Sequence, residues 1–345
     1  MPNINYYLKS KIFIISWLLL FACQPERKPE ASFYYWKSNF QLSVVEKSYL
    51  NQLKVRRLYV KFFDVDWDFA NKQALPLATL EVSEKLPEIL EIVPVVFITN
   101  RTLVQIKESQ LPAFGKQISL KIKALADKQK VTFSEIQLDC DWSEKSKQNF
   151  FQLVGIVKKQ VPNTQISVTV RLHQLKYSFQ TGVPPADKGM LMFYNMGKLD
   201  GSNTENSILD NTLAKAYLRK LPEYPLPLDI ALPIYSWAVL KRANKIINLL
   251  NFENEKIFAD TAKFEKLSEN KFLVRESHYL NAVYLYQDDE IRLEKVDFEA
   301  LEEAVKLLKP VINQANPHIV FYHLDSQNLQ NLSYENLEIL VNYFR

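Results

Sequence analysis

Two aspartates, Asp139 and Asp141, follow the segment Glu135-Ile136-Gln137-Leu138, which reads as a buried strand, and they are well placed for chemistry. Side chains alternate along a strand, so residues i and i+2 point to the same face. Two neighbouring carboxyl groups repel each other, and the repulsion raises the pKa of one of them. A raised pKa yields a proton donor beside a charged base. We therefore predict Asp139 and Asp141 as catalytic residues, with Asp141 the acid or base and Asp139 the residue that tunes it.

The segments around this pair predict a repeating strand-and-helix architecture. Helix-like patterns cover residues 81–90, 117–130, 147–161, 298–309 and 334–344. Apolar, β-branched and aromatic runs that read as strands cover 32–36, 57–66, 92–99, 133–141, 165–173, 190–196, 228–235 and 318–324. Eight strands with intervening helices predict an α/β fold of the (β/α)8 TIM barrel type, with a doubly wound sheet as the alternative.

Short alternating strands in residues 271–296 interrupt this pattern before the last strand. They predict a small β-rich insertion over about residues 253–297 of a barrel domain that spans 32–345.

Polar and aromatic residues gather where the expected strands end. The carboxyl ends of parallel strands meet at one mouth of a barrel, and active sites are built there. Aromatic rings stack on the C–H faces of sugars, while charged groups bind hydroxyls, so these residues suit a carbohydrate site. The predicted substrate-binding residues are Trp36, Asp64, Asp66, Trp67, Trp142, Arg171, His173, Tyr194, Asn195, Tyr235, Trp237, His323 and Asp325.

Three of these segments resemble chitinase-type glycoside hydrolases. Asp139-Cys140-Asp141-Trp142 resembles their Asp-x-Asp-Trp motif, which precedes a catalytic glutamate. Met192-Phe193-Tyr194-Asn195 resembles their Met-x-Tyr-Asp segment, and Leu232-Pro233-Ile234-Tyr235 with Trp237 resembles the segment that follows. The resemblance implies a (β/α)8 barrel that acts on or binds a carbohydrate.

A closer resemblance is to an uncharacterised bacterial lipoprotein family of chitinase-like barrels. Its Gln-x-Asp-x-Asp and Met-x-Tyr-Asn-Met-Gly motifs match Gln137 to Asp141 and Met192 to Gly197, and Ile166-Ser167-Val168-Thr169 fits its intervening strand.

The chain departs from the chitinase motif where the proton donor belongs. Ser143 stands at the position of the catalytic glutamate, Ile136 replaces an earlier aspartate, and Asn195 replaces the aspartate that orients an acetamido group. Glu144 follows Ser143, but one residue along a strand points to the opposite face.

Three interpretations follow from this departure. The chain is a glycoside hydrolase with relocated acid chemistry, for which Asp64, Asp66 or Asp325 could supply the second carboxylate. Alternatively, it is a non-catalytic glycan-binding barrel. In the third interpretation, Arg171 neutralises Asp139 and the cluster is a buried ion network.

His173 and His323 could hold a metal ion together with the aspartates, but neither lies in a close-spaced ligand motif. We therefore predict no metal and no cofactor.

The N-terminus predicts a lipid anchor. Lys9 and Lys11 precede an apolar stretch, 12–21, and Cys23 follows Ala22 at the expected cleavage point, so residues 1–22 read as a signal peptide. This order resembles the lipobox of bacterial lipoproteins and implies lipidation of Cys23, with 23–31 as a tether. The alternative is an ordinary signal peptide. Gln24 favours the outer membrane of a diderm bacterium, on its periplasmic or cell-surface side.

Composition limits the remaining options. The formal net charge of +4 falls to about +2 without the two signal lysines, which indicates no nucleic-acid partner. With Cys23 lipidated, Cys140 is the one other cysteine, so an intrachain disulfide and a cysteine metal site are both excluded. The predicted partners are a carbohydrate and, through Cys23, the membrane.

Overall fold

The computed structural model describes residues 28–345, apart from 201–203, 251–254, 281, 313 and 315. The predicted signal peptide and Cys23 lie outside the described residues. None of the helices in the described residues combines the length and the apolar composition that a membrane-spanning helix requires.

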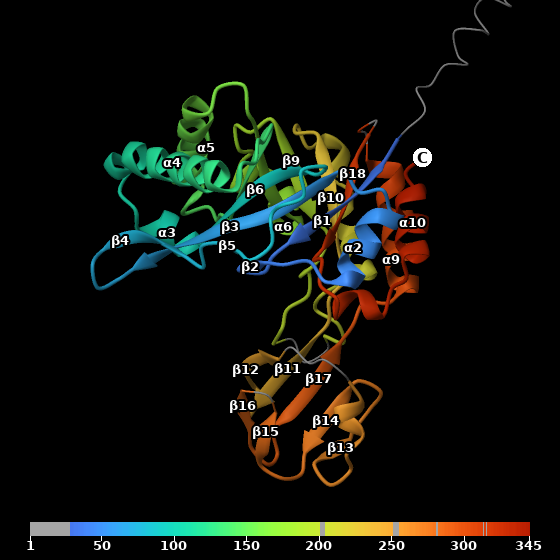
Figure 1. Cartoon of the computed structure of the whole chain (residues 1–345). Coiled ribbons are helices and arrows are strands. Elements are labelled where there is room, and N and C mark those ends of the chain that lie inside the picture. Colours follow the sequence, from blue (N-terminus) through green and yellow to red (C-terminus); the bar gives the residue numbers. More distant parts are fainter. Residues whose placement is uncertain (1–27, 201–203, 251–254, 281, 313, 315) are drawn as a thin grey trace, which may run out of the picture.

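Eight parallel strands form a closed barrel, which confirms the predicted (β/α)8 fold (Figure 1). Each strand pairs with the next, and β1 pairs with both the second and the last strand, so the sheet has no open end. The strands are β1 (Glu30–Tyr35), β3 (Arg57–Asp68), β6 (Glu91–Ile98), β7 (Glu135–Asp139), β8 (Gln165–Arg171), β9 (Lys188–Met192), β10 (Leu228–Pro233) and β18 (His318–Tyr322). Every residue of β7, β9 and β10 is buried, as expected for strands with side chains packed on both faces.

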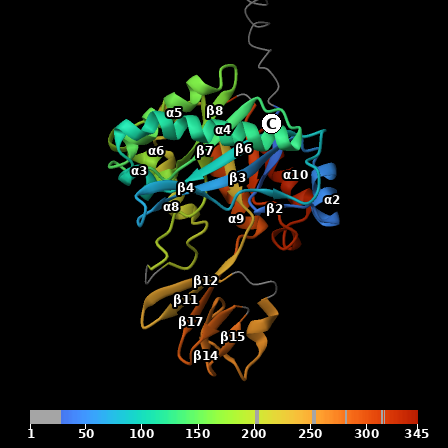
Figure 2. The ribbon, with the colours of Figure 1, turned by 60° about the vertical axis from the view of Figure 1, so that its left-hand side comes forward.

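Helices surround the barrel (Figure 2). They are α2 (Val44–Gln52), α3 (Asn100–Gln105), α4 (Leu111–Gln129), α5 (Lys147–Gln160), α6 (Leu172–Lys176), α7 (Ser178–Thr181), α8 (Asn211–Leu218), α9 (Phe298–Leu308) and α10 (Tyr334–Asn342). Short 3-10 helices are η1 (Glu108–Gln110), η2 (Leu221–Glu223), η3 (Glu255–Ala259), η4 (Lys309–Val311) and η5 (Asn328–Gln330). In α5, Phe150, Leu153, Val154 and Val157 are buried at helical spacing, so this helix covers the barrel next to β7.

The helix expected over 81–90 does not form. Glu81–Val82 is instead a short strand, β5, which pairs with β2 (Asn39–Phe40), and bends and turns follow it. Pro87 explains the difference, because a proline inside a helix lacks an N–H donor and the residue before it avoids the helical region. The strand β4 (Gln73–Leu77) adds a hairpin to the outer end of β3.

A separate antiparallel sheet lies between β10 and β18. Its strands run in the order β12 (Lys245–Leu250), β11 (Trp237–Arg242), β17 (Glu290–Glu294), β14 (Lys271–Val274) and β13 (Phe264–Lys266), and a hairpin of β15 (His278–Leu280) and β16 (Val283–Leu285) accompanies it. The β-rich insertion expected from about residue 253 therefore begins earlier, at Trp237. Both views show it projecting from the barrel (Figures 1 and 2), and it has its own hydrophobic cluster around Phe258, Phe264 and Phe272.

Buried ion pairs close the end of the barrel at which the strands begin. Lys188 bridges Glu135 at 2.9 Å and Asp229 at 2.8 Å, and Arg57 pairs with Glu135 at 3.1 Å. Buried charges are tolerated when they are paired in this way. The interior at this end is therefore filled, and the open end is the one where the carboxyl ends of the strands meet.

Candidate functional site

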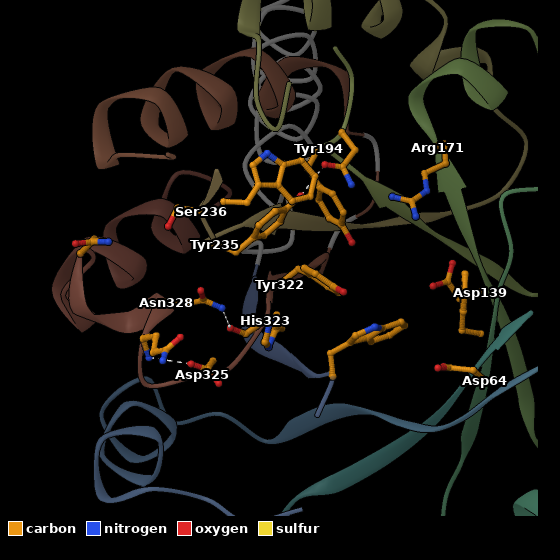
Figure 3. Close-up of a pocket in the computed structure, with 16 residues that line it drawn as sticks. Asp64, Asp139, Arg171, Tyr194, Tyr235, Ser236, Tyr322, His323, Asp325 and Asn328 are labelled. Carbon is orange, nitrogen blue, oxygen red and sulfur yellow. Dashed lines mark hydrogen bonds between the residues drawn. The ribbon is translucent and has the colours of Figure 1, made fainter. Parts of the chain in front are cut away.

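A cavity of about 490 Å³ opens at the carboxyl ends of the barrel strands (Figure 3). Its lining mixes aromatic rings with carboxyl, amide and imidazole groups, which is the composition of a ligand site. It is lined by Trp36, Asp64, Phe97, Asp139, Arg171, Tyr194, Asn195, Tyr235, Ser236, Trp237, Tyr322, His323, Asp325, Gln327, Asn328 and Asn331. Ten of the fifteen predicted site residues are in this set, and they come from strands far apart in the sequence.

A smaller cavity of about 120 Å³ adjoins it and contains two more predicted residues, Asp141 and His173. The two cavities share Arg171, Tyr194 and Asn195 in their walls, so these three side chains separate them.

The prediction that Asp139 and Asp141 share one face of a strand is wrong, although the carboxylate of Asp141 still adds to the rise that burial causes in the pKa of Asp139. The strand β7 ends at Asp139, so the alternation that would place residue 141 on the same face no longer applies. Asp139 faces the main cavity and is 3% exposed, whereas the side chain of Asp141 is 51% exposed and lines the smaller cavity. Arg171 lies between them and donates from Nε to Asp141 Oδ1 at 2.6 Å. No ion pair joins Arg171 to Asp139, so the expected neutralisation of Asp139 is limited to the nearby Arg171 charge, which lowers the pKa of the carboxyl less than burial raises it.

Three predicted binding residues lie outside both cavities. Trp142 is fully buried, stacks on Phe150 at 5.1 Å, and donates from Nε1 to the Thr181 carbonyl at 3.0 Å, so it cannot stack on a sugar. Trp67 packs in the main hydrophobic core.

Asp66 is bound by Arg101 and by the Thr99 hydroxyl, and these contacts hold the pKa of its carboxyl well below its usual range. Asp66 and Trp67 both lie outside the cavities because β3 extends to Asp68 and pairs with β4, and this extension carries the two residues beyond the barrel mouth.

Asp139 carries the most perturbed carboxyl of the main cavity. Burial raises its pKa from 3.8 to about 6, although the nearby Arg171 charge and the Thr169 hydroxyl, which donates to Oδ1 at 2.6 Å, act in the opposite direction. A carboxyl with a pKa near 6 can hold or release a proton close to neutral pH, as a general acid or base must.

Asp64 lies near Asp139 across one strand. The sheet register pairs Asp64 with Phe97, and Phe97 with Asp139, so the three residues stand side by side on β3, β6 and β7. Strands are about 4.8 Å apart, which places the two aspartate Cα atoms about 9.6 Å from each other. Lys61 binds Asp64 Oδ2 at 3.1 Å, while Oδ1 is buried without a hydrogen-bond partner among the described residues. Two carboxyl groups from different strands therefore flank the same part of the cavity.

An aromatic cluster centred on Tyr322 forms another wall of the cavity (Figure 3). Its ring centroid lies 5.2 Å from Tyr194, 5.4 Å from Trp36 and 5.7 Å from Tyr235. Tyr322 is not among the predicted binding residues, although its position at the end of the last strand is the signal that could have identified it. Phe97, at the end of β6, is missed in the same way.

Hydrogen bonds fix several of the lining residues. The Tyr235 hydroxyl donates to Asn195 Oδ1 at 2.7 Å, and Trp237 Nε1 donates to Glu294 Oε2 at 2.8 Å. Lys37 pairs with Asp325 at 3.0 Å. Residue positions in such a site are set before any ligand arrives, which lowers the entropy cost of binding.

The position of the chitinase acid is outside the cavity. The Ser143 hydroxyl donates to Asn100 Oδ1 at 3.4 Å, and its backbone N–H donates to Ser146 Oγ at 2.9 Å. Glu144 is exposed in the turn that precedes α5. Neither residue lines the main or the smaller cavity.

Within the described residues, no group of three His, Cys, Asp or Glu side chains could hold a metal ion. His173 and His323 line different cavities, and burial lowers the pKa of both imidazoles.

Comparison with known proteins identifies the fold. No model of a protein family matches the chain, and no curated protein matches it. Among solved structures, the chain is similar to the spore cortex-lytic enzyme SleL of Bacillus cereus, with 13% identity, a TM-score of 0.53, and coverage of 93% of this chain and 75% of that one.

It is also similar to a chitinase from Chromobacterium violaceum, with 11% identity, a TM-score of 0.54, and coverage of 91% and 99%. For a mutant GH18 chitinase from Cycas revoluta in complex with (GlcNAc)4, the values are 12% identity, a TM-score of 0.52, and coverage of 92% and 100%. At these identities, the likeness establishes a (β/α)8 barrel of the kind found in these chitinases.

The raised pKa of Asp139 predicts a stability that depends on pH. The folded-state pKa of about 6 lies above the ordinary 3.8, so folding favours the protonated form and ionisation costs stability as the pH rises between these values. We expect Asp139→Asn to increase the free energy of unfolding near pH 7.5 by up to about 3 kcal/mol and to change it little near pH 3.5. Urea denaturation of both proteins at the two pH values measures this. An equal effect at both would show that the carboxyl is not perturbed by folding.

Proposed function

We propose that the chain is a glycoside hydrolase-like protein that binds a carbohydrate at the barrel mouth. The observation that carries this proposal is the main cavity, in which the Tyr322 aromatic cluster faces the buried carboxyl of Asp139. Aromatic walls with a few convergent polar groups are what sugar rings require. The GH18 neighbour in complex with (GlcNAc)4 supports the proposal, because a related barrel accommodates an oligosaccharide.

Trp237 provides the test of binding. It lines the cavity, while its partner Glu294 keeps contacts with Ser207 and Arg292, so removal of the indole leaves that carboxylate bonded. We expect Trp237→Ala to weaken binding of a β-1,4-linked tetrasaccharide about tenfold, as for the loss of about 1.4 kcal/mol of stacking. Isothermal titration with tetrasaccharides of glucose, N-acetylglucosamine and glucosamine measures this.

Phe179→Ala is the matched control, because Phe179 is fully exposed and lies outside both cavities. If both variants bind like the unmodified protein, the barrel mouth is not the carbohydrate site.

Hydrolysis is the second candidate function, favoured by the pKa of about 6 at Asp139 and by the nearby Asp64. In this role Asp139 would protonate the leaving oxygen, and Asp64 would act as the second carboxylate. The chitinase acid position contributes nothing here, because Ser143 is bound to Asn100 outside the cavity.

We expect Asp139→Asn to lower kcat at least about 100-fold, the usual effect of losing an acid–base residue. Product analysis of tetrasaccharide digests measures the rate. Glu144→Gln is the control with an exposed carboxylate, and it should keep full activity. Asp139 is excluded as the acid if Asp139→Asn keeps its activity, or if the Glu144→Gln control loses activity as well. Binding without any product would leave the non-catalytic barrel as the function.

We also propose that the chain belongs with the uncharacterised lipoprotein-like barrels and is anchored through Cys23 to the outer membrane. The support is the order of Lys9, Lys11, the apolar stretch and Ala22-Cys23 in the sequence. Expressed in a diderm bacterium, Cys23→Ser should move the protein from the membrane fraction to the soluble periplasm. Retention in the membrane by this variant would argue for attachment through another part of the chain.

A further inference from the structure

The charges around the main cavity do not cancel. Five carboxylates stand against three cations when all are ionised, an excess of two negative charges. The carboxylates are those of Asp64, Asp139, Asp141, Asp325 and Glu46, and the cations are those of Lys37, Lys61 and Arg171. His323 adds no charge near neutral pH, because burial lowers the pKa of its imidazole.

One of the two excess negative charges is at Asp139, and the other is shared by Asp325 and Glu46, which have Lys37 as their common cation. Each of the three cations has a carboxylate partner: Lys61 pairs with Asp64 at 3.1 Å, Lys37 with Asp325 at 3.0 Å and with Glu46, and Arg171 with Asp141 at 2.6 Å. The Arg171 contact is through Nε, and Nη1 is buried without a hydrogen-bond partner among the described residues.

Among the described residues, Asp139 makes no ion pair, and the Thr169 hydroxyl is its one hydrogen-bond donor. The titratable groups that face it from neighbouring elements are Arg171, Asp141, Asp64, Tyr34, Tyr194 and Tyr322. Of these, Arg171 alone is basic, and Asp141 holds its Nε.

The aromatic walls also favour a positive charge. The ring faces of Trp and Tyr attract cations placed within about 6 Å of the centroid. Two rings of the cavity already hold one, because Lys61 Nζ lies 5.5 Å from the Trp36 centroid and Arg171 Cζ lies 5.5 Å from that of Tyr194. The faces of Tyr322 and Tyr235 belong to the same cluster. A carboxylate without an ion-pair partner beside such rings suits an ammonium group.

We infer that the carbohydrate bound here is an amino sugar with a protonated free amine, a hexosamine without its N-acetyl group, and that Asp139 is the counter-ion of that amine. The inference rests on the proposed function and specifies its ligand. The ammonium would donate to the Asp139 carboxylate, and the aromatic walls would cover the sugar ring.

Three β-1,4-linked tetrasaccharides test this inference, because they differ in the group at carbon 2. Glucosamine carries an ammonium, N-acetylglucosamine a neutral amide, and glucose a hydroxyl. At pH 6.5 we expect the glucosamine tetramer to bind at least about tenfold more tightly than the other two in isothermal titration, as for a charge-assisted hydrogen bond. Its affinity should fall on both sides of this pH: the carboxyl gains a proton at lower pH, and the amine loses one at higher pH.

Two variants separate a specific ion pair from a general effect of charge. Asp139→Asn should reduce the preference for glucosamine over glucose to nearly one. Asp66→Asn removes the same charge from a residue beyond the barrel mouth, outside both cavities, and should keep the preference.

The outcomes distinguish the two proposals. If the glucose or N-acetylglucosamine tetramer binds as tightly as the glucosamine tetramer, the inference is overturned and the carbohydrate-binding function stands. The same holds if Asp139→Asn and Asp66→Asn reduce the preference equally. If none of the three tetramers binds, the proposed function fails, and the inference fails with it.

Discussion

Pairing of β1 with both β18 and β3 closes the sheet, and this closure decides where the functional groups of the chain meet. Eight parallel strands leave no free edge, so all their carboxyl ends point to one mouth. Residues as distant in sequence as Trp36 and Asp325 thereby line one cavity. Without closure, the same residues would be spread along the edge of an open sheet and could not surround a ligand.

The buried carboxylates at the two ends of the barrel differ in whether they have a basic partner. At the N-terminal end, Lys188 lies between Glu135 and Asp229, and each carboxylate has a basic partner within 3 Å. At the mouth, Asp139 is buried almost as deeply but has a hydroxyl group as its donor. In the first arrangement each buried carboxylate has a cation that offsets the cost of removing it from water. The second leaves a carboxyl whose ionisation opposes folding, which is the kind of cost that functional sites carry.

The sequence predicted the barrel well because its strands are buried on both faces and read as apolar runs. All eight strands appear within a few residues of their expected positions, and ten of the fifteen site residues line the main cavity. The failures occurred where a strand boundary decides the outcome. Asp141 separates from Asp139 because β7 ends between them, and Asp66 leaves the cavity because β3 continues past it. Trp142 was predicted as a binding residue because it follows Asp141 in the motif, but Phe150 of helix α5 packs against its indole and buries it. Boundaries and long-range packing of this kind are not encoded in periodicity.

The insertion has a hydrophobic cluster of its own, yet its first strand begins with Trp237, a residue of the cavity wall. Trp237 is bonded to Glu294, the last residue of β17, so the neighbouring strands β11 and β17 of the insertion are joined at the cavity. A ligand that contacts this indole binds the state in which Trp237 is in its folded position. By mass action, its binding therefore stabilises the insertion, which folds outside the barrel. Ligand affinity and the local unfolding of the insertion are in this way linked thermodynamically.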